Sequence, residues 1–142
     1  MKLNIKNETG RLKSVVLGQP NSLGAIPTLE ESYDAKSYNT IQQGTYPSEK
    51  EVINEMNEFE KILKKYDVQV FRPEIIEDYN QVFARDVAFV IEDKMIISNV
   101  ISDRADEQEA YRKIFEEVKW RDIINLPDTA HIEGGDVIVW ND

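Results

Sequence analysis

The chain has 142 residues, of which 41% are hydrophobic and 31% are charged, a composition typical of a globular domain that buries its own core. Its formal net charge is −10, with 27 acidic and 17 basic side chains, which argues against a nucleic-acid surface and favours small cationic ligands. It contains no cysteine, hence no disulfide and no thiolate nucleophile, and no apolar run long enough to span a membrane. We therefore expect a cytoplasmic protein.

Hydrophobic periodicity at the start of the chain predicts a buried strand followed by a long loop. Residues 11–18 alternate and then run apolar before Pro20, which is typical of a first strand. Residues 19–47 are rich in Gly, Pro, Asn, Ser and Tyr and are predicted to be a loop. Its side chains either contact a substrate or form a plain solvated surface; the candidates are Tyr33, Tyr38, Asn39, Gln42, Gln43 and Tyr46.

The rest of the chain has the mixed pattern of an α/β protein. Ser48 and Glu51 form a capping box ahead of apolar residues at helical spacing, which predicts a helix over 49–66. A second amphipathic stripe predicts a helix over 105–119. Short apolar runs between turn residues predict the remaining strands, at 68–71, at 87–98 as a pair joined by a turn at 92–94, at 124–126 and at 136–140.

Two segments about fifty residues apart echo one another. Residues 85–91 and 135–141 each contain an aspartate that leads directly into an apolar run, a repetition that predicts βαβ-like modules. The second run ends without the hairpin partner that the first one has. We therefore expect a truncated architecture; the alternative is that residues 136–140 form an ordinary edge strand.

The acidic turns FARD (83–86) and HIEGGD (131–136) carry the candidate chemistry. If Asp86 and Glu133 face one cavity, each raises the pKa of the other unless a cation lies between them. A guanidinium suits such a site because its planar fork accepts a carboxylate on each side. The alternative is structural: Arg85 pairs with a neighbouring acid and Asp136 caps a turn. The residues alone leave both interpretations open.

His131 raises the question of a metal site. With Glu133 and Asp136 it offers three possible ligands in sequence, but a single histidine and the absence of cysteine favour a structural histidine and no metal. The chain also lacks a glycine-rich phosphate loop, a dinucleotide fingerprint and a Ser-His-Asp arrangement. We accordingly expect no cofactor.

The runs NQVFARDVAFVIEDKMIISN and HIEGGDVIV, with the opening GRLKSVVLGQP, resemble the guanidino-group-modifying enzymes of the pentein superfamily, namely arginine deiminases, dimethylarginine dimethylaminohydrolases and amidinotransferases. The resemblance implies an α/β propeller of five ββαβ modules around a central active site. Residues 1–142 would be the N-terminal part of that single domain and supply roughly the first two to three modules.

The resemblance also assigns roles to residues. Asp86 would grip the substrate guanidinium, Glu133 would orient it opposite the nucleophile, and Arg85 would support substrate binding. Gly134, Gly135 and Asp136 would shape the turn. In the family the cysteine nucleophile and the catalytic histidine come from the C-terminal half, so this chain by itself is expected to be inactive. Val87 stands where arginine deiminases commonly have proline, which leaves the hydrolase and amidinotransferase branches open.

The expected partners follow from these roles. They are a small guanidino substrate, the missing C-terminal half of the propeller and a second copy of the chain in a homo-oligomer, with neither nucleic acid nor membrane among them. Two other functions remain open at this point. One is a non-catalytic binding module for arginine-like cations that retains Asp86 and Glu133, and the other is a scaffold whose acidic turns are only structural.

Overall fold

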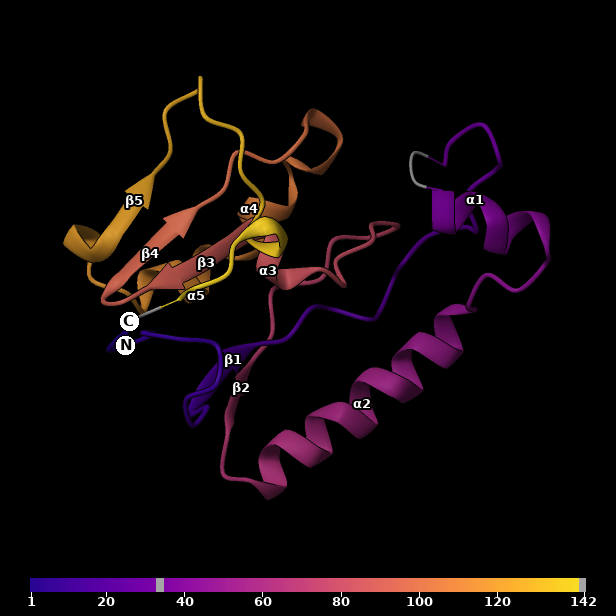
Figure 1. Ribbon diagram of the computed structural model, residues 1–142. Coiled ribbons are helices and arrows are strands. Elements are labelled where there is room, and N and C mark those ends of the chain that lie inside the picture. The colour runs from indigo at the N-terminus through magenta and orange to yellow at the C-terminus, as the bar shows by residue number, and fades with distance from the viewer. Residues whose placement is uncertain (33–34, 141–142) are drawn as a thin grey trace.

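The computed structural model describes residues 1–32 and 35–140, apart from the side chain at position 103. Within them the chain is a mixed α/β structure with two small sheets (Figure 1). One sheet holds β1 and β2, and the other holds β3, β4 and β5 in that order. The mixed α/β class predicted from the sequence is therefore confirmed, whereas the propeller and its number of modules stay predictions. No helix in the described ranges has the length and apolar character needed to cross a bilayer.

The first sheet is a βαβ unit. β1 (Ser14–Val16) and β2 (Gln69–Phe71) are parallel, with Val15 opposite Val70. Parallel neighbours need a crossover, which is supplied by α2 (Glu49–Lys65), the long helix at the lower right of Figure 1. The helix begins at the predicted capping box, where the Ser48 side chain accepts from the Glu51 amide and the Glu51 carboxylate accepts from the Ser48 amide. The expected helix is confirmed to within one residue.

Alternation along this sheet creates two packing faces. Val15 and Val70 pack with the helix-side cluster of Leu17, Leu63 and Val68. The next residues along each strand point the opposite way. Val16 and Phe71 pack against the second cluster, made of Val87, Ala110, Tyr111 and Ile114. This two-stranded sheet thus joins α2 to the half of the molecule that carries the acidic turns.

The prediction of a loop over residues 19–47 is wrong in part. It contains α1 (Ala35–Gln42), which is followed by a turn at Gly44, where φ is +65°. None of the residues of this helix is buried, and Ser, Tyr, Asn and Thr within it are weak helix formers. The many turn-forming residues around it therefore favoured a loop, although Asp34 before the helix and Gly44 after it are residues that commonly flank helices. Tyr33, one of the candidate contact residues, lies outside the described residues.

The second sheet forms a ββαβ sequence. β3 (Ala88–Ile91) and β4 (Lys94–Ile97) make the predicted antiparallel pair, with Glu92 in the turn at φ +51°. β5 (Ile123–Asn125) is parallel to β4, as a helical crossover allows. Two short helices make that crossover, α4 (Glu107–Ala110) and α5 (Arg112–Glu116), and both lie behind the sheet in Figure 1.

The single helix predicted over 105–119 is wrong, because the segment is divided at Tyr111. The Ala110 carbonyl accepts from the Glu74 amide at 2.9 Å, while Ile114 donates to Tyr111 instead. A hydrogen bond from a distant segment therefore interrupts the regular helical ladder. The expected apolar stripe is nevertheless buried, since Tyr111, Ile114 and Val118 are at most 5% exposed.

The strand predicted over 136–140 is also wrong. A 3₁₀ turn, η3 (Gly134–Asp136), is followed by irregular backbone up to residue 140. Side chains take the backbone groups that a sheet would use: the Val139 amide donates to Glu8, and the Val137 carbonyl accepts from Arg85. Ile138 and Trp140 remain 76% and 85% exposed. With no neighbouring strand in the described residues, the apolar run has nothing to pair with.

Candidate guanidinium-binding site

The two acidic turns predicted from the sequence meet in space. The FARD segment forms most of the short helix α3 (Ala84–Val87), and this helix packs against η3, the turn of the HIEGGD segment. Both lie at the centre of Figure 1. The Gly135 amide donates to Asp86 Oδ1 at 3.1 Å, which joins the two turns directly. The echo between the two segments thus reflects two turns that face one another, although neither aspartate opens a strand.

Gly134 permits this approach. A β-carbon at position 134 would lie 2.0 Å from the Arg85 carbonyl oxygen and 3.0 Å from the Phe89 β-carbon. Both atoms belong to rigid parts of the fold, so no other residue fits without moving α3 or β3. Gly135 is also close, with its hypothetical β-carbon 2.6 Å from Asp86 Oδ1. The glycines therefore set the distance between the turns.

Arg85 holds the second turn in place. Its Nε donates to the Gly134 carbonyl at 2.8 Å, and its Nη2 donates to the Val137 carbonyl. The remaining edge of the guanidinium pairs with Glu8, at 3.1 Å from Nη1 and 2.8 Å from Nη2. This geometry makes Arg85 a positioning residue for the turn. A direct contact between Arg85 and substrate stays a prediction.

Glu8 is a partner that the sequence did not reveal. It lies far from both motifs in the chain, yet it pairs with Arg85 and accepts from the Val139 amide at 2.9 Å. The hydrogen bond from Arg85, then that from Val139, lowers the pKa of Glu8 from 4.5 to about 2. The N-terminal segment is thereby tied to the backbone that follows Glu133. No local motif surrounds Glu8, so only the fold identifies it.

The two candidate substrate carboxylates converge on an arginine of the chain itself. Arg104 Nη1 lies 3.0 Å from Asp86 Oδ2 and 3.7 Å from Glu133 Oε2. The side chains are mostly enclosed, with exposed fractions of 15% for Arg104, 18% for Asp86 and 33% for Glu133. Asp86 and Glu133 therefore face the same point, and a guanidinium nitrogen occupies it. We call Asp86 and Glu133 the carboxylate pair.

The other edge of Arg104 is held by Glu107. Nε lies 2.6 Å from Oε1 and Nη2 lies 3.1 Å from Oε2, a bidentate ion pair. The Glu107 side chain is fully buried, and this burial raises its pKa although Arg104 opposes the shift. Burial also acts to lower the pKa of Arg104, but the hydrogen bond and charge of Glu107, with those of Asp86, outweigh it and leave the pKa raised. Arg104 is thus a permanently charged guanidinium, held by Glu107 on the edge opposite Asp86 and Glu133.

Arg104 and Glu107 were not singled out in the sequence. Arg104 lies one residue before the helix predicted over 105–119 and Glu107 lies in its first turn, where an Arg and a Glu three residues apart suggest a surface ion pair. In the structure Arg104 ends a 3₁₀ turn, η1 (Ser102–Arg104), and Glu107 begins α4, and both side chains are enclosed, at 15% and 0% exposed. The available signal was the i, i+3 spacing, which does not distinguish a surface pair from a buried one.

His131 and Asp136, the other polar residues of the second turn, are exposed. Among the described residues, no group of three or more His, Asp or Glu side chains is arranged to hold a metal ion. His131, Glu133 and Asp136 therefore do not converge as metal ligands. Of these three side chains, Glu133 is the one that lies within ion-pair distance of Arg104.

Comparison with solved structures identifies similar folds. The chain is similar to SxtG, an amidinotransferase from Microseira wollei in the saxitoxin biosynthetic pathway (TM-score 0.66, 23% identity, covering 88% of this chain and 43% of that one). It is also similar to inosamine-phosphate amidinotransferase from Streptomyces griseus (TM-score 0.60, 15% identity, 88% and 43% covered). A third is dimethylarginine dimethylaminohydrolase as an adduct with S-methyl-L-thiocitrulline (TM-score 0.53, 14% identity, 89% and 46% covered).

The chain spans less than half the length of each of these proteins. No protein-family model matches the chain, and no curated protein matches it. All three solved structures are enzymes of the pentein superfamily, the superfamily that the two acidic motifs resemble. The likeness extends over nearly nine-tenths of the chain, at identities that establish similarity of fold. The resemblance seen in the sequence is thus confirmed at the level of the fold: over 88–89% of its length the chain is similar in fold to these two amidinotransferases and to dimethylarginine dimethylaminohydrolase.

Proposed function

We propose that this chain forms the substrate-holding part of an enzyme that acts on the guanidinium group of arginine or an arginine derivative. The observation that carries the proposal is the position of Arg104, whose guanidinium lies against Asp86 and within ion-pair distance of Glu133. The carboxylate pair, spaced by Gly134 and Gly135, is built for a planar cation with several N–H donors. The similar solved structures support this choice of ligand, since they include amidinotransferases and a dimethylarginine hydrolase.

In the proposed complex the substrate takes the place of one nitrogen of Arg104. Only Nη1 of Arg104 contacts the carboxylate pair, whereas Nε and Nη2 are held by Glu107 on the opposite edge. Binding of the substrate therefore requires that Nη1 of Arg104 move away from Asp86 and Glu133. The two carboxylates then keep the substrate guanidinium protonated, and its central carbon stays electrophilic only in that form.

The covalent steps need groups that this chain does not contain. It has no cysteine, so the thiolate that adds to the guanidinium carbon in the resembling family must come from elsewhere in the protein. In the proposed reaction the C–N bond to the departing amine breaks, and a histidine protonates that amine. Water or an acceptor amine then displaces the thiolate. Asp86 and Glu133 hold the substrate throughout, with Glu133 orienting it toward the nucleophile.

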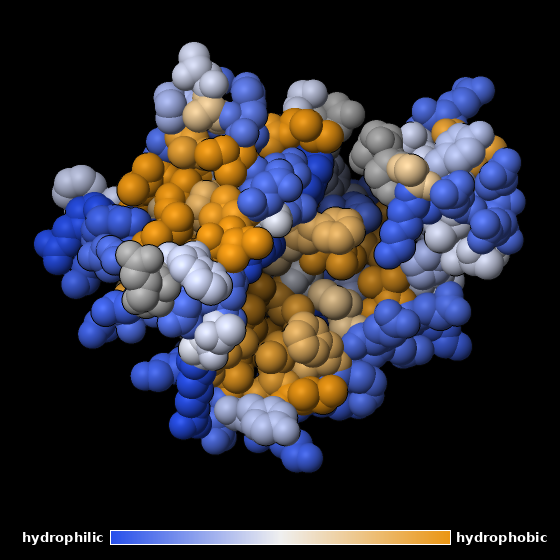
Figure 2. All heavy atoms as spheres, in the orientation of Figure 1, coloured by the Kyte–Doolittle hydropathy of each residue, from blue (hydrophilic) through white to orange (hydrophobic). Residues whose placement is uncertain are grey.

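Exposed apolar surface supports the proposal that a further part of the protein packs against this chain. Figure 2 shows hydrophobic residues gathered in a hollow at the middle of the visible face, with hydrophilic residues around it. Several large apolar side chains are more than half exposed among the described residues; they include Phe83, Ile75, Ile138, Trp120 and Trp140. Patches of this kind mark interaction sites. We propose that the C-terminal half of the propeller covers part of this surface, with self-association as the expected behaviour of the chain without it.

The binding step is tested by titrating the chain with L-arginine in a calorimeter. We expect weak saturable binding, because the ligand competes with Arg104, and we expect Asp86→Asn and Glu133→Gln each to weaken it by roughly tenfold or more. Asp136→Asn is the matched control, because it removes a charge three residues from Glu133 on an exposed side chain. Equal binding by all four proteins would show that arginine binds away from Asp86 and Glu133, and no binding by any of them would leave only a scaffold.

The proposed catalytic step is tested by reading the coding sequence that follows the codon for residue 142. We expect it, or a separately encoded partner, to supply a histidine and a cysteine close to its C-terminal end. Replacing that cysteine by alanine should abolish release of ammonia or amine, or transfer of the amidino group. A reading frame that ends at residue 142 with no second half would contradict the enzyme and favour a binding module for arginine-like cations.

A further inference from the structure

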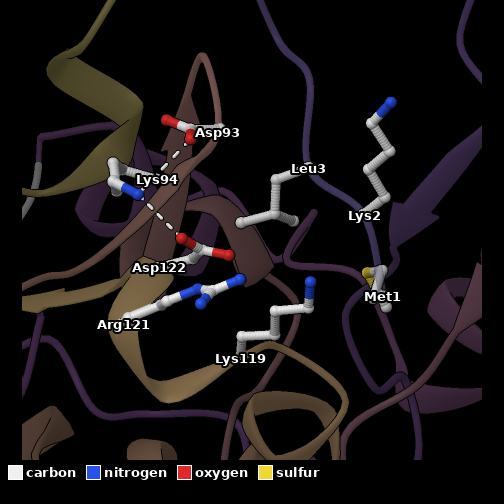
Figure 3. Close-up of a pocket in the computed structure, with 8 residues that line it drawn as sticks. All are labelled: Met1, Lys2, Leu3, Asp93, Lys94, Lys119, Arg121 and Asp122. Atoms are coloured by element: carbon white, nitrogen blue, oxygen red, sulfur yellow. Dashed lines mark hydrogen bonds and ion pairs between the residues drawn. The ribbon is translucent and has the colours of Figure 1, made fainter.

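A second hollow lies at the far end of β3 from the carboxylate pair. Asp86 precedes the first residue of β3, whereas Asp93 and Lys94 follow its last. Three separate segments line this hollow, residues 1–3, 93–94 and 119–122 (Figure 3). Its volume is about 780 Å³, which is ample for a small solute. We call it the basic hollow.

The charge of the basic hollow is opposite to that of the whole chain. Its lining includes the four cationic side chains of Lys2, Lys94, Lys119 and Arg121 and two carboxylates, on Asp93 and Asp122. The chain as a whole has a net charge of −10. A local excess of cations in an acidic protein concentrates anions at that point.

One of the cations, Lys94, forms ion pairs with both carboxylates. Lys94 Nζ lies 2.7 Å from Asp122 and 3.4 Å from Asp93, as the dashed lines in Figure 3 mark. Lys119 and Arg121 have no carboxylate within ion-pair distance in the described part of the chain. The pKa of Asp122 is lowered chiefly by its hydrogen bond with Lys94, and the charges of Arg121 and Lys119 lower it further. Two cations without an ion-pair partner among the described residues therefore line the hollow, whose four cationic and two acidic side chains leave a net charge of +2.

Local backbone structure directs both side chains inward. A 3₁₀ turn, η2 (Trp120–Asp122), begins directly after Lys119. Both Lys119 and Arg121 line the hollow, while Trp120 between them is 86% exposed. In Figure 3 the Arg121 guanidinium and the Lys119 side chain both reach toward Leu3, and the Lys2 ammonium is turned away. The arrangement therefore depends on Lys119 and Arg121, with Lys94 and Asp122 as its fixed wall.

We propose that the basic hollow binds a phosphate group. The Arg121 fork can donate to two phosphate oxygens, and the Lys119 ammonium supplies a point charge beside it. A dianion between them would remove the repulsion of two like charges. Because both side chains are exposed, the contacts are screened and binding is weak, on the order of millimolar. The site is separate from the carboxylate pair, which repels anions.

The test is a titration of the ¹⁵N-labelled chain with inorganic phosphate, followed by amide shifts in NMR spectra, with sodium chloride at equal ionic strength as the reference. We expect saturable shifts at residues 93–94 and 119–122. The Lys119→Gln/Arg121→Gln variant should bind phosphate roughly fivefold to tenfold more weakly. Lys50→Gln/Lys65→Gln, which removes two exposed cations from α2, is the matched control and should bind like the unmodified chain.

Shifts that fail to saturate, or that sodium chloride reproduces, would overturn the proposal. So would equal weakening of phosphate binding in both double variants, which would indicate only nonspecific electrostatic attraction of phosphate to cationic side chains. Arginine binding at the carboxylate pair serves as an independent reference. The Lys119→Gln/Arg121→Gln variant should retain it, whereas Asp86→Asn should lose it and keep phosphate binding. Failure at one site is thereby distinguishable from failure at the other.

Discussion

Arg104 provides the sharpest test of how the site is built. Replacing it with methionine keeps a similar volume but leaves Glu107, whose side chain is fully buried, without its bidentate partner. Leaving one member of a buried pair alone typically costs about 3–5 kcal/mol in the free energy of unfolding. That is a large share of the roughly 5–15 kcal/mol that stabilises a domain. We expect Arg104→Met to lower the urea midpoint strongly, measured by circular dichroism.

The comparison that isolates this effect is the double variant Arg104→Met/Glu107→Leu. Both variants leave Asp86 and Glu133 equally unpaired, so their repulsion cancels between the two. With the buried charge removed, we expect at least about 2 kcal/mol of stability to return, since an apolar pair of similar volume often replaces a buried ion pair without loss. The slope of the free energy against urea should not change.

The pH dependence gives a second measure on the same variant. Burial already raises the pKa of Glu107, and removal of Arg104 takes away the opposing effect. A carboxyl group whose pKa is higher in the folded state than in the unfolded state destabilises the fold at high pH, where it is charged. The fold regains this stability as the pH falls from the folded-state pKa to the unfolded-state pKa. The loss in Arg104→Met should therefore shrink with decreasing pH, and the part of this pH dependence that comes from Glu107 should be absent from the double variant. A double variant as unstable as the single one at every pH would refute the buried pair.

Three further changes test the framework of the site by denaturant or thermal unfolding. Gly134→Ala should destabilise the fold by more than about 2 kcal/mol, because its β-carbon would lie 2.0 Å from the Arg85 carbonyl oxygen. The control Gly44→Ala, where only the positive φ is strained, should lose about 1 kcal/mol. Equal losses in the two variants would contradict the close packing at Gly134. Ser48→Ala removes the α2 cap and should cost about 0.5–2 kcal/mol, and no loss would contradict the capping box. Glu8, with a pKa lowered to about 2, should stabilise the fold above pH 4.5 and lose this effect as the pH falls from 4.5 toward 2. Because Glu8 is 36% exposed, we expect less than about 1 kcal/mol, and Glu8→Gln should flatten stability across that window; an unchanged slope would exclude the Glu8–Arg85 pair as its cause.

Local signals predicted the elements that depend on local interactions. The capping box at Ser48 fixes the start of α2, and the β3–β4 hairpin follows from two apolar runs with a short polar turn between them. The prediction over 136–140 fails for a complementary reason. Its apolar run has strand character, but a strand exists only where a neighbour accepts its backbone hydrogen bonds, and here Glu8 and Arg85 take them.

The sequence by itself determined the mixed α/β class, the two acidic turns, the absence of a thiolate, and the candidates Asp86 and Glu133. The tertiary structure decided what these residues face. Asp86, Arg104 and Glu133 are at least 18 residues apart in the chain. They meet because η3 packs on α3 and because Arg104 pairs with the buried Glu107 at the start of α4. Periodicity records which residues prefer burial, whereas the pairing of buried charges depends on how distant segments pack, and that information is not local.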